Sequence, residues 1–220
     1  MTQDPATKPF AKVLLTLASA LALLVGLWAA RHLLQPPAAL PTLVSGTALP
    51  APRPLAAFTL TDQHGQSFDL ARFKGAWTLL FFGYTHCPDV CPTTLATLNS
   101  VAQKVAAAGP PRVPLQVVFV SVDPARDTVQ RLAEYVPYFN KDFLGVTGTP
   151  AQLDAFTAQL NILHMRGSDT AADGGYTVDH TASVLLIDPQ ARFNAVFSAP
   201  HVATTLANDF LSLRSYYEDL

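Results

Sequence analysis

The feature that most constrains this chain is an apolar run without charges near its start. The run "VLLTLASALALLVGLWAA" covers residues 13–30, and as a helix it would be about 27 Å long, close to the thickness of a bilayer's hydrocarbon core. A buried helix of a soluble protein seldom lacks polar residues over about five turns. A cleaved signal peptide has a shorter apolar region, of roughly 7–15 residues, and a small-x-small cleavage site. The run therefore predicts an uncleaved membrane anchor over residues 13–31.

Charges and prolines around the anchor predict what lies on either side of it. Lys8 and Lys12 precede the run and outweigh Arg31 after it, so the positive-inside rule places residues 1–12 as a tail in the cytoplasm. Residues 32–54 are rich in proline and show no hydrophobic periodicity. Such a segment is extended and stiff, so we expect a spacer between the membrane and a domain outside the cytoplasm.

Charge excludes one class of partner. The formal net charge is -2 and only 14% of the residues are charged. No basic run follows the anchor. Long-range attraction to a polyanion is therefore not expected, and the sequence argues against nucleic-acid binding.

The remaining residues, 55–220, are sufficient for one domain with a single core. Two alternating segments around His64 and Gly65 predict a β-hairpin, and Asp127 is expected to cap a helix with Gln130 at the capping-box position. Apolar runs of strand length alternate with segments of helical period, which predicts an α/β sheet with helices on both faces. The expected strands are 77–84, 115–123, 182–188 and an edge strand at 193–197, and the expected helices are 92–108, 127–139, 150–161 and 202–216.

Cys87 and Cys91, in "GYTHCPDVCPTTL", are the only cysteines. They lie between a predicted central strand and the first turn of a helix, where chemistry collects in α/β sheets and where a thiolate is stabilised. A structural disulfide closing so short a loop would constrain the unfolded chain little. The spacing is one residue longer than the C-x-x-C of thioredoxin-type redox pairs. Redox chemistry and metal binding both remain open, and the wider loop leaves room for an ion.

A two-sulfur metal site needs a further ligand, and Cys₂His sets suit copper or zinc. Among the six histidines, His180 in "TVDHTASVLLID" is distinct because it ends a glycine-rich loop and precedes a buried strand. Such a loop can carry the imidazole to the cysteine turn, with Asp179 available to orient it. A structural role for His180 remains an equal alternative. His86 could tune the neighbouring thiol, and His164 is interpreted as structural.

Three blocks together resemble the Sco/SenC family of copper-binding assembly factors for cytochrome c oxidase: "GYTHCPDVCPTTL", "VSVDPARDT" and "VDHTASVLLIDP". The resemblance extends from about residue 55 to the C-terminus. It implies a thioredoxin-like α/β fold, a sheet flanked by helices, with an added N-terminal hairpin. It also implies a site for Cu(I) and Cu(II) made by Cys87, Cys91 and His180. Asp123, in the "VSVDP" block, is expected to support the site without binding the ion.

The function implied by this resemblance is that of a membrane-anchored copper chaperone. Its partner would be subunit II of cytochrome c oxidase, whose dinuclear copper centre it would help to assemble, with another copper donor and a thiol reductant as further partners. The short tail lacks the features of a transit peptide, so a bacterial inner membrane with the domain in the periplasm is expected. The alternative is a thiol–disulfide oxidoreductase that reduces the copper-ligand cysteines of the same subunit. A peroxidase is less favoured, because no arginine or general acid is evident beside Cys87.

Overall fold

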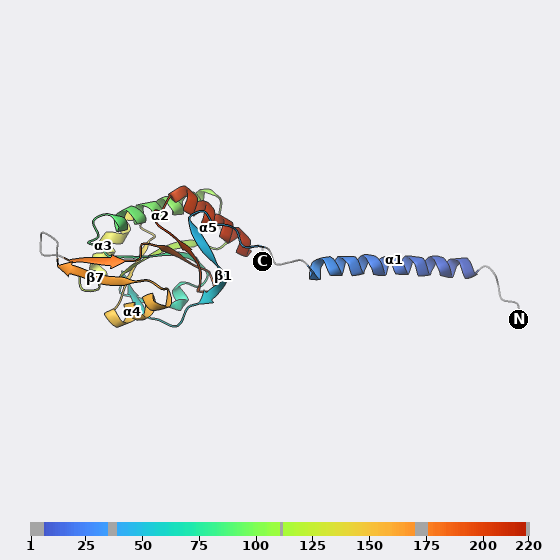
Figure 1. Cartoon of the computed structure of the whole chain (residues 1–220), viewed down its shortest axis with the longest axis horizontal. Coiled ribbons are helices and arrows are strands. Elements are labelled where there is room, and N and C mark those ends of the chain that lie inside the picture. Colours follow the sequence, from blue (N-terminus) through green and yellow to red (C-terminus); the bar gives the residue numbers. More distant parts are fainter. Residues whose placement is uncertain (1–6, 35–38, 111, 170–175, 219–220) are drawn as a thin grey trace. The chain divides into compact units, whose positions relative to one another are not determined.

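The structure is a computed structural model that describes residues 7–34, 39–110, 112–169 and 176–218. The chain divides into two compact units, residues 1–39 and 40–220, and each is described by itself. In the first unit, helix α1 (Thr7–Leu33) contains the segment Ala11–Arg31, 21 residues with a mean hydropathy of 2.3 (Figure 1). Within the described ranges this is the one helix long and apolar enough to cross a membrane. The expected apolar helix is confirmed, whereas most of the predicted tail, residues 1–6, lies outside the described residues.

The second unit is built on an eight-stranded sheet with the order β1-β10-β9-β4-β5-β6-β2-β3. Strands β4, β5 and β6 are parallel, and β9 runs antiparallel to β4. Because β9 runs the opposite way, its start lies beside the carboxyl end of β4. The strands of this sheet are β1 (Gly46–Pro54), β2 (Leu60–Asp62), β3 (Ser67–Phe68), β4 (Trp77–Gly83), β5 (Leu115–Ser121), β6 (Leu144–Thr147), β9 (Val184–Ile187) and β10 (Arg192–Phe197).

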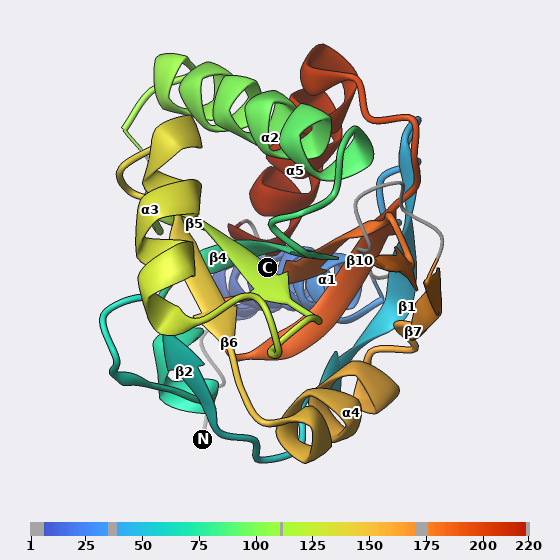
Figure 2. The same cartoon turned by 90° about the vertical axis from the view of Figure 1, so that its left-hand side faces the viewer.

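Helices cover both faces of the sheet, as expected. Figure 2 shows α2, α3 and α5 over one face and α4 over the other. The crossovers from β4 to β5 and from β5 to β6 proceed in the same direction across the sheet, so right-handed connections place α2 and α3 on one side. The helices are α2 (Val90–Ala107), α3 (Val129–Phe139), α4 (Pro150–Gln159), α5 (Ala203–Glu218) and a short 3₁₀ turn at Leu70–Arg72.

Strand β4 is the centre of the core, and all seven of its residues are buried. A strand covered on both faces reads as a continuous apolar run, which is why "WTLLFFG" shows no alternation. On the α4 side, Phe58 and Phe156 have ring centroids 4.3 Å apart, and Phe58 lies 5.7 Å from Phe73. Phe82 of β4 joins this cluster, with its ring centroid 5.9 Å from that of Phe156, so the packing helps to fix β4 and the loop that follows it.

The expected spacer over residues 32–54 is wrong in its second half. Residues Gly46–Pro54 form strand β1, which pairs antiparallel with β10. Its prolines are compatible with a strand because β1 is at the edge of the sheet, where a missing N–H costs no internal hydrogen bond. The segment expected as an edge strand, 193–197, is consequently second from the edge. Residues 35–38 of the predicted spacer lie outside the described part of the chain.

Just before β1, the chain is held by a buried carboxylate of α5. Asp209 accepts hydrogen bonds from the backbone N–H of Val44, at 3.0 Å, and of Ser45, at 2.7 Å. The Ser45 hydroxyl also donates to it, at 2.6 Å. These bonds make residues 44–54 an integral part of the folded domain.

The second unit contains two hairpins, one at the edge of the sheet and one separate from it. The predicted hairpin around His64 and Gly65 is confirmed as β2 and β3, and β2 joins the sheet through β6. A second, separate hairpin was not expected: β7 (His164–Asp169) pairs antiparallel with β8 (Tyr176–His180). The predicted glycine-rich loop is thus replaced by strand from Tyr176 onwards, while residues 170–175 lie outside the described residues.

One predicted cap is wrong. Thr128, not Asp127, is the N-cap of α3, and its hydroxyl accepts a hydrogen bond from the Arg131 N–H at 3.2 Å. Asp127 is instead fully buried and faces the loop after β4. The capping-box pattern favoured Asp127 because Gln130 lies three residues after it, whereas Arg131 lies three residues after Thr128, the observed cap.

Candidate metal centre

The two cysteines lie where β4 gives way to α2. Cys87 precedes the helix and Cys91 occupies its first turn. The Cys91 N–H donates to the Cys87 sulfur at 3.4 Å, so this sulfur satisfies one of the free N–H groups at the helix start. Both thiols are free; Cys87 is 9% exposed and Cys91 is fully buried. Cys87 therefore lies closer to the surface than Cys91 does.

His180 reaches the same place from a distant part of the sequence. It ends β8, just before β9 begins beside the carboxyl end of β4. Its Nε2 lies 3.4 Å from the Cys91 Sγ. The ligand atoms of Cys87, Cys91 and His180 all lie within 4.8 Å of one another. Two sulfurs and one imidazole in this arrangement form a donor set suited to copper or zinc.

The backbone and two aromatic rings orient the His180 imidazole. Its Nδ1 lies 3.2 Å from the Thr181 carbonyl oxygen, which favours a proton on Nδ1 and leaves the Nε2 lone pair directed to the sulfurs. The rings of Phe81 and Tyr84 contact it edge-on, at 6.1 and 6.0 Å between centroids. Asp179, expected to orient the ring, is exposed, and alternation along β8 places it on the opposite face. The Thr181 carbonyl takes that role instead.

The two sulfurs share one proton. The hydrogen bond from the Cys91 thiol lowers the pKa of Cys87 to about 3, with a further contribution from His180 and against the effect of burial. The hydrogen bond that the Cys91 thiol donates to Cys87, together with burial, raises the pKa of Cys91 far above its ordinary range. The metal-free pair is thus one thiolate and one thiol, and a metal ion bound by both sulfurs would release the remaining proton.

Gly83, the last residue of β4, makes room for the inner sulfur. A Cβ at this position would lie 2.7 Å from the Cys91 Sγ and 2.8 Å from the Phe119 ring. No side chain larger than hydrogen fits without moving one of them. Gly83 is not among the site residues expected from the sequence, although a glycine at the end of a central strand signals such a close approach.

Gly83→Ala is expected to displace the Cys91 sulfur. Overpacking of this kind costs about 1–3 kcal/mol of unfolding free energy, and it should also weaken Cu(I) binding by the chain. Gly148→Ala is a matched control, because its Cβ would crowd Leu60 at 2.7 Å but no sulfur. Urea unfolding and Cu(I) competition titration should show lower stability for both variants and lower affinity for Gly83→Ala alone. Equal affinities for the two variants would contradict this role.

The sequence of the second unit identifies the family of this chain. Residues 47–214 match the family model described as SCO1/SenC. The chain belongs to the SCO1/SenC family.

Relatives extend from bacteria to mitochondria. A protein from Stutzerimonas stutzeri is 36% identical over 152 residues, which are 69% of this chain and 72% of its own length. The bovine mitochondrial SCO2 homologue, from Bos taurus, is 36% identical over 151 residues, or 69% of this chain, but only 56% of its own length is covered. This SCO1/SenC chain thus spans little more than half of that longer relative.

Solved structures confirm the thioredoxin-like Sco fold. The crystal structure of Arabidopsis thaliana ScoI, which contains bound copper, superposes with a TM-score of 0.68 at 30% identity and covers 75% of this chain and 98% of its own. The solution structure of apo Sco1 from Thermus thermophilus gives a TM-score of 0.63 at 32% identity, over 83% of this chain and 100% of its own. The predicted fold class and family resemblance are both confirmed.

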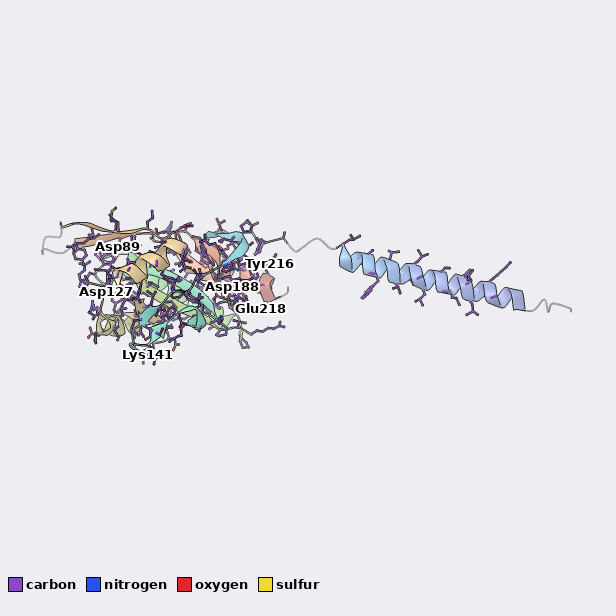
Figure 3. The ribbon with its side chains drawn as sticks, turned by 90° about the horizontal axis from the view of Figure 1, so that it is seen from below. Asp89, Asp127, Lys141, Asp188, Tyr216 and Glu218 are labelled. Atoms are coloured by element: carbon purple, nitrogen blue, oxygen red, sulfur yellow. The ribbon has the colours of Figure 1, made fainter. Side chains whose placement is uncertain are left out.

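A buried carboxylate supports the loop that carries Cys87 in this SCO1/SenC domain. Asp127 accepts hydrogen bonds from the Thr85 N–H at 2.8 Å and the Thr85 hydroxyl at 2.7 Å, and the Ser121 hydroxyl also donates to it. Figure 3 shows Asp127 and Asp89 at one end of the domain and Asp188 at the other. His86, beside Cys87, points its Nδ1 toward the same carboxylate at 3.6 Å. The network anchors the turn between β4 and the first cysteine.

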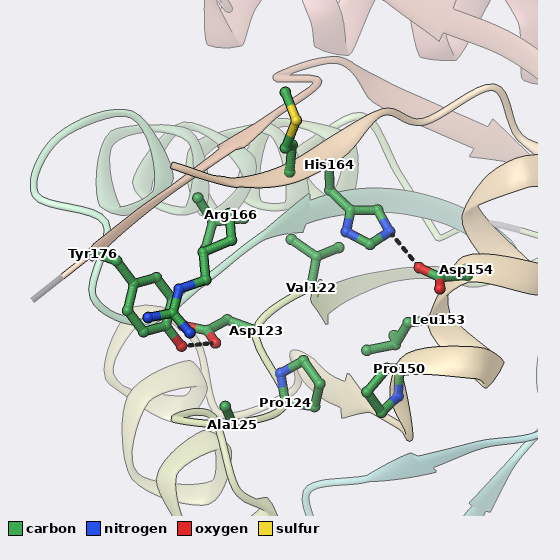
Figure 4. Close-up of a pocket in the computed structure, with 12 residues that line it drawn as sticks. Val122, Asp123, Pro124, Ala125, Pro150, Leu153, Asp154, His164, Arg166 and Tyr176 are labelled. Carbon is green, nitrogen blue, oxygen red and sulfur yellow. Dashed lines mark hydrogen bonds and ion pairs between the residues drawn. The ribbon is translucent and has the colours of Figure 1, made fainter. Parts of the chain in front are cut away.

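Asp123 holds the hairpin that carries His180. Its carboxylate accepts a hydrogen bond from the Tyr176 hydroxyl at 2.6 Å (Figure 4) and is ion-paired with Arg126. The guanidinium groups of Arg126 and Arg166 lie over the Tyr176 ring, each with Cζ 3.7 Å from the centroid. Tyr176 starts β8 and His180 ends it, so these contacts act on the strand that positions the imidazole. That Asp123 supports the copper site stays a prediction.

Tyr176→Phe is expected to loosen that strand. The variant loses the hydrogen bond to a charged carboxylate, which should lower the free energy of unfolding by about 1.5–3 kcal/mol. Its affinity for Cu(I) should fall by about tenfold, because contacts beyond the ligands themselves hold the ligands in position. Tyr138→Phe is the control, since Tyr138 is 85% exposed on α3. Cu(I) competition titrations on both variants measure the difference. An unchanged affinity for Tyr176→Phe would show that the hairpin holds His180 without this contact.

Three other histidines of the second unit, His64, His164 and His201, lie outside the group of ligand atoms formed by Cys87, Cys91 and His180. His64 is in the β2–β3 turn, as expected, with Nε2 3.5 Å from the Gln63 side chain. His201 places its Nε2 2.8 Å from the Ala182 carbonyl. His164 lies at the start of β7, with Nε2 3.3 Å from Asp154. Among the described residues, His180 is the histidine that joins the two cysteines.

Proposed function

We propose that this SCO1/SenC protein is a membrane-anchored copper chaperone. Cys87, Cys91 and His180 would hold the ion, and the chain would help to assemble the dinuclear copper centre of cytochrome c oxidase subunit II. The observation that carries the proposal is the convergence of these three ligand atoms within 4.8 Å in a fold whose Arabidopsis relative contains copper.

The donor set suits an ion that changes oxidation state. Thiolates favour Cu(I), and an imidazole also suits Cu(II). Formation of a Cys87–Cys91 disulfide would pass two electrons to an external oxidant and release the one proton that the pair holds, and it would take both sulfurs out of the ligand set. Redox state and copper content are therefore linked: the reduced chain binds copper and the oxidised chain does not.

The anchor gives the proposed location. Helix α1 would hold the chain in a bacterial inner membrane, with residues 1–12 in the cytoplasm and the domain in the periplasm. Loading there would require a periplasmic copper donor, and renewal of the thiols would require a reductant. The apolar segment Ala11–Arg31 and the bacterial relatives support this placement.

A second function is favoured by the state of the outer thiol. Cys87 is 9% exposed, whereas Cys91 is fully buried, and the pKa of Cys87 is lowered to about 3, so Cys87 is a thiolate at neutral pH. Such a sulfur can attack a partner disulfide, with Cys91 then closing an internal disulfide. The chain would in that case be a thiol–disulfide oxidoreductase for the copper-ligand cysteines of subunit II.

The deciding experiment is an anaerobic titration of the full chain in detergent. Reduced protein should bind one equivalent of Cu(I), and protein oxidised to the Cys87–Cys91 disulfide should bind none. In parallel, metal-free reduced protein is mixed with a disulfide-bonded peptide carrying two copper-ligand cysteines. Copper binding without peptide reduction supports the chaperone, whereas peptide reduction that survives His180→Ala supports the oxidoreductase. Failure of the reduced chain to bind Cu(I) would refute the chaperone.

A further inference from the structure

We propose that His164 and His180 form a second copper position, specific for Cu(II), on the inner face of the β7–β8 hairpin. This inference rests on the proposed function, because the ion would pass between this position and the cysteines. In the register of the hairpin, His164 in β7 lies directly opposite His180 in β8. Residues directly opposite in antiparallel strands project from the same face.

The type of pairing brings the two side chains close. The N–H of Thr181 donates to the Leu163 carbonyl at 2.9 Å, so the backbone bonds flank the His164–His180 pair and do not join it. Opposed residues of this kind have Cα atoms about 4.5 Å apart, closer than hydrogen-bonded pairs. Two imidazoles on such a pair can be bridged by one metal ion when their rings turn toward each other.

The His164 ring is already arranged as metal-binding histidines are. Its Nε2 lies 3.3 Å from the Asp154 carboxylate of α4 (Figure 4). A carboxylate that accepts one ring N–H leaves the other nitrogen as a lone-pair donor. The His164 side chain is only 18% exposed, and it lines a cavity of about 510 Å³ between the hairpin, α4 and the loop after β5. The free nitrogen therefore has space in which the ring can reorient.

Sharing of His180 couples the two positions. In the structure the His180 Nε2 faces Cys91 at 3.4 Å, so binding at the imidazole pair requires this ring to turn away from the sulfurs. Two imidazoles with a nearby carboxylate favour Cu(II), whereas thiolates favour Cu(I). The pair would retain cupric ion when the cysteines are oxidised and cannot bind it. The ion would move between the two positions as Cu(II), so its oxidation state would not change.

The test separates this position from the thiol site by removing the sulfurs. The full chain carrying Cys87→Ser and Cys91→Ser is titrated with CuSO₄ in detergent, and the nitrogen ligands are counted by electron paramagnetic resonance. One equivalent bound through two imidazole nitrogens is expected. Addition of His164→Ala should weaken binding at least tenfold and leave a single imidazole signal. His164→Gln, which keeps a polar group near Asp154, should do the same if the first variant is poorly folded.

The matched control is His64→Ala in the same double-serine background, because His64 lies in the distant β2–β3 turn. It should leave both the affinity and the two-nitrogen signal unchanged. The proposal is overturned if the double-serine chain binds no Cu(II), or if His164 variants bind it as the parent does. Loss of Cu(I) binding by the wild-type chain would instead refute the chaperone function, so the two failures are distinguishable.

Discussion

Cys91→Ser is expected to lower the affinity of the reduced chain for Cu(I) by about a thousandfold, or ~4 kcal/mol. The serine hydroxyl is a hard, protonated donor and does not replace a thiolate for a soft ion. The substitution is nearly isosteric, so the loop should keep its shape. His180→Ala removes a neutral donor and should cost less, about a hundredfold. Competition with a chelator of known Cu(I) affinity measures both changes.

The control for this prediction lies on the same helix. Ser100 donates only to the Ala96 carbonyl of α2, and Ser100→Ala should bind Cu(I) as the wild type does. If Cys91→Ser and His180→Ala also retain wild-type affinity, the ion is not held by this three-residue set. A loss for Cys91→Ser with no loss for His180→Ala would instead indicate a two-sulfur site.

Asp209→Ala is expected to lower the free energy of unfolding by about 1.5–3 kcal/mol or more, because hydrogen bonds to a charged acceptor are lost and their donors are left unsatisfied. The substitution leaves the N–H groups of Val44 and Ser45 without their acceptor and the Ser45 hydroxyl without a partner. It should therefore also release β1 from the edge of β10. Urea unfolding of the full chain gives the energy, and hydrogen exchange across residues 44–54 reports the release.

The neighbouring Asn208 provides the control, because it is exposed on the same helix. Asn208→Ala should change stability by no more than about 0.5 kcal/mol, as is usual for surface substitutions. A similarly small effect of Asp209→Ala would mean that β1 is held by its pairing with β10 alone. A soluble form of the domain should in any case begin before Val44, since a start at residue 55 would delete β1.

Some features of the fold are visible in the sequence because local pattern and tertiary environment agree. The run ending at Gly83 is apolar throughout because both faces of β4 are covered, and Pro150 opens α4 within a Thr149 cap. The turn at Gly65, which has a φ of 76°, needs a residue tolerant of that conformation. These signals depend on a few neighbouring residues and can be read directly.

Other features depend on contacts that no local pattern encodes. Strand β1 resembles a linker because of its prolines, and its place in the sheet is set by Asp209, far away in the chain. The β7–β8 hairpin is largely exposed and polar, so it lacks the alternation that marks a strand. Asp127 was misassigned because its partners, including Thr85, meet it only in the folded domain. The cysteines are recognisable in the sequence because the chain has no others. The position of His180 beside them depends on the antiparallel direction of β9 next to β4, which the sequence alone does not give.

The unequal depth of the two sulfurs sets an order of events for any ion carried here. Cys91 is fully buried and its sulfur packs against Gly83, whereas Cys87 is 9% exposed. An incoming ligand can therefore displace the outer sulfur or the imidazole first, and the inner sulfur is the last bond to break. In the proposed chaperone, release would then be stepwise: the acceptor would bind the ion before the last donor bond breaks, so that free ion would not escape into the surrounding water.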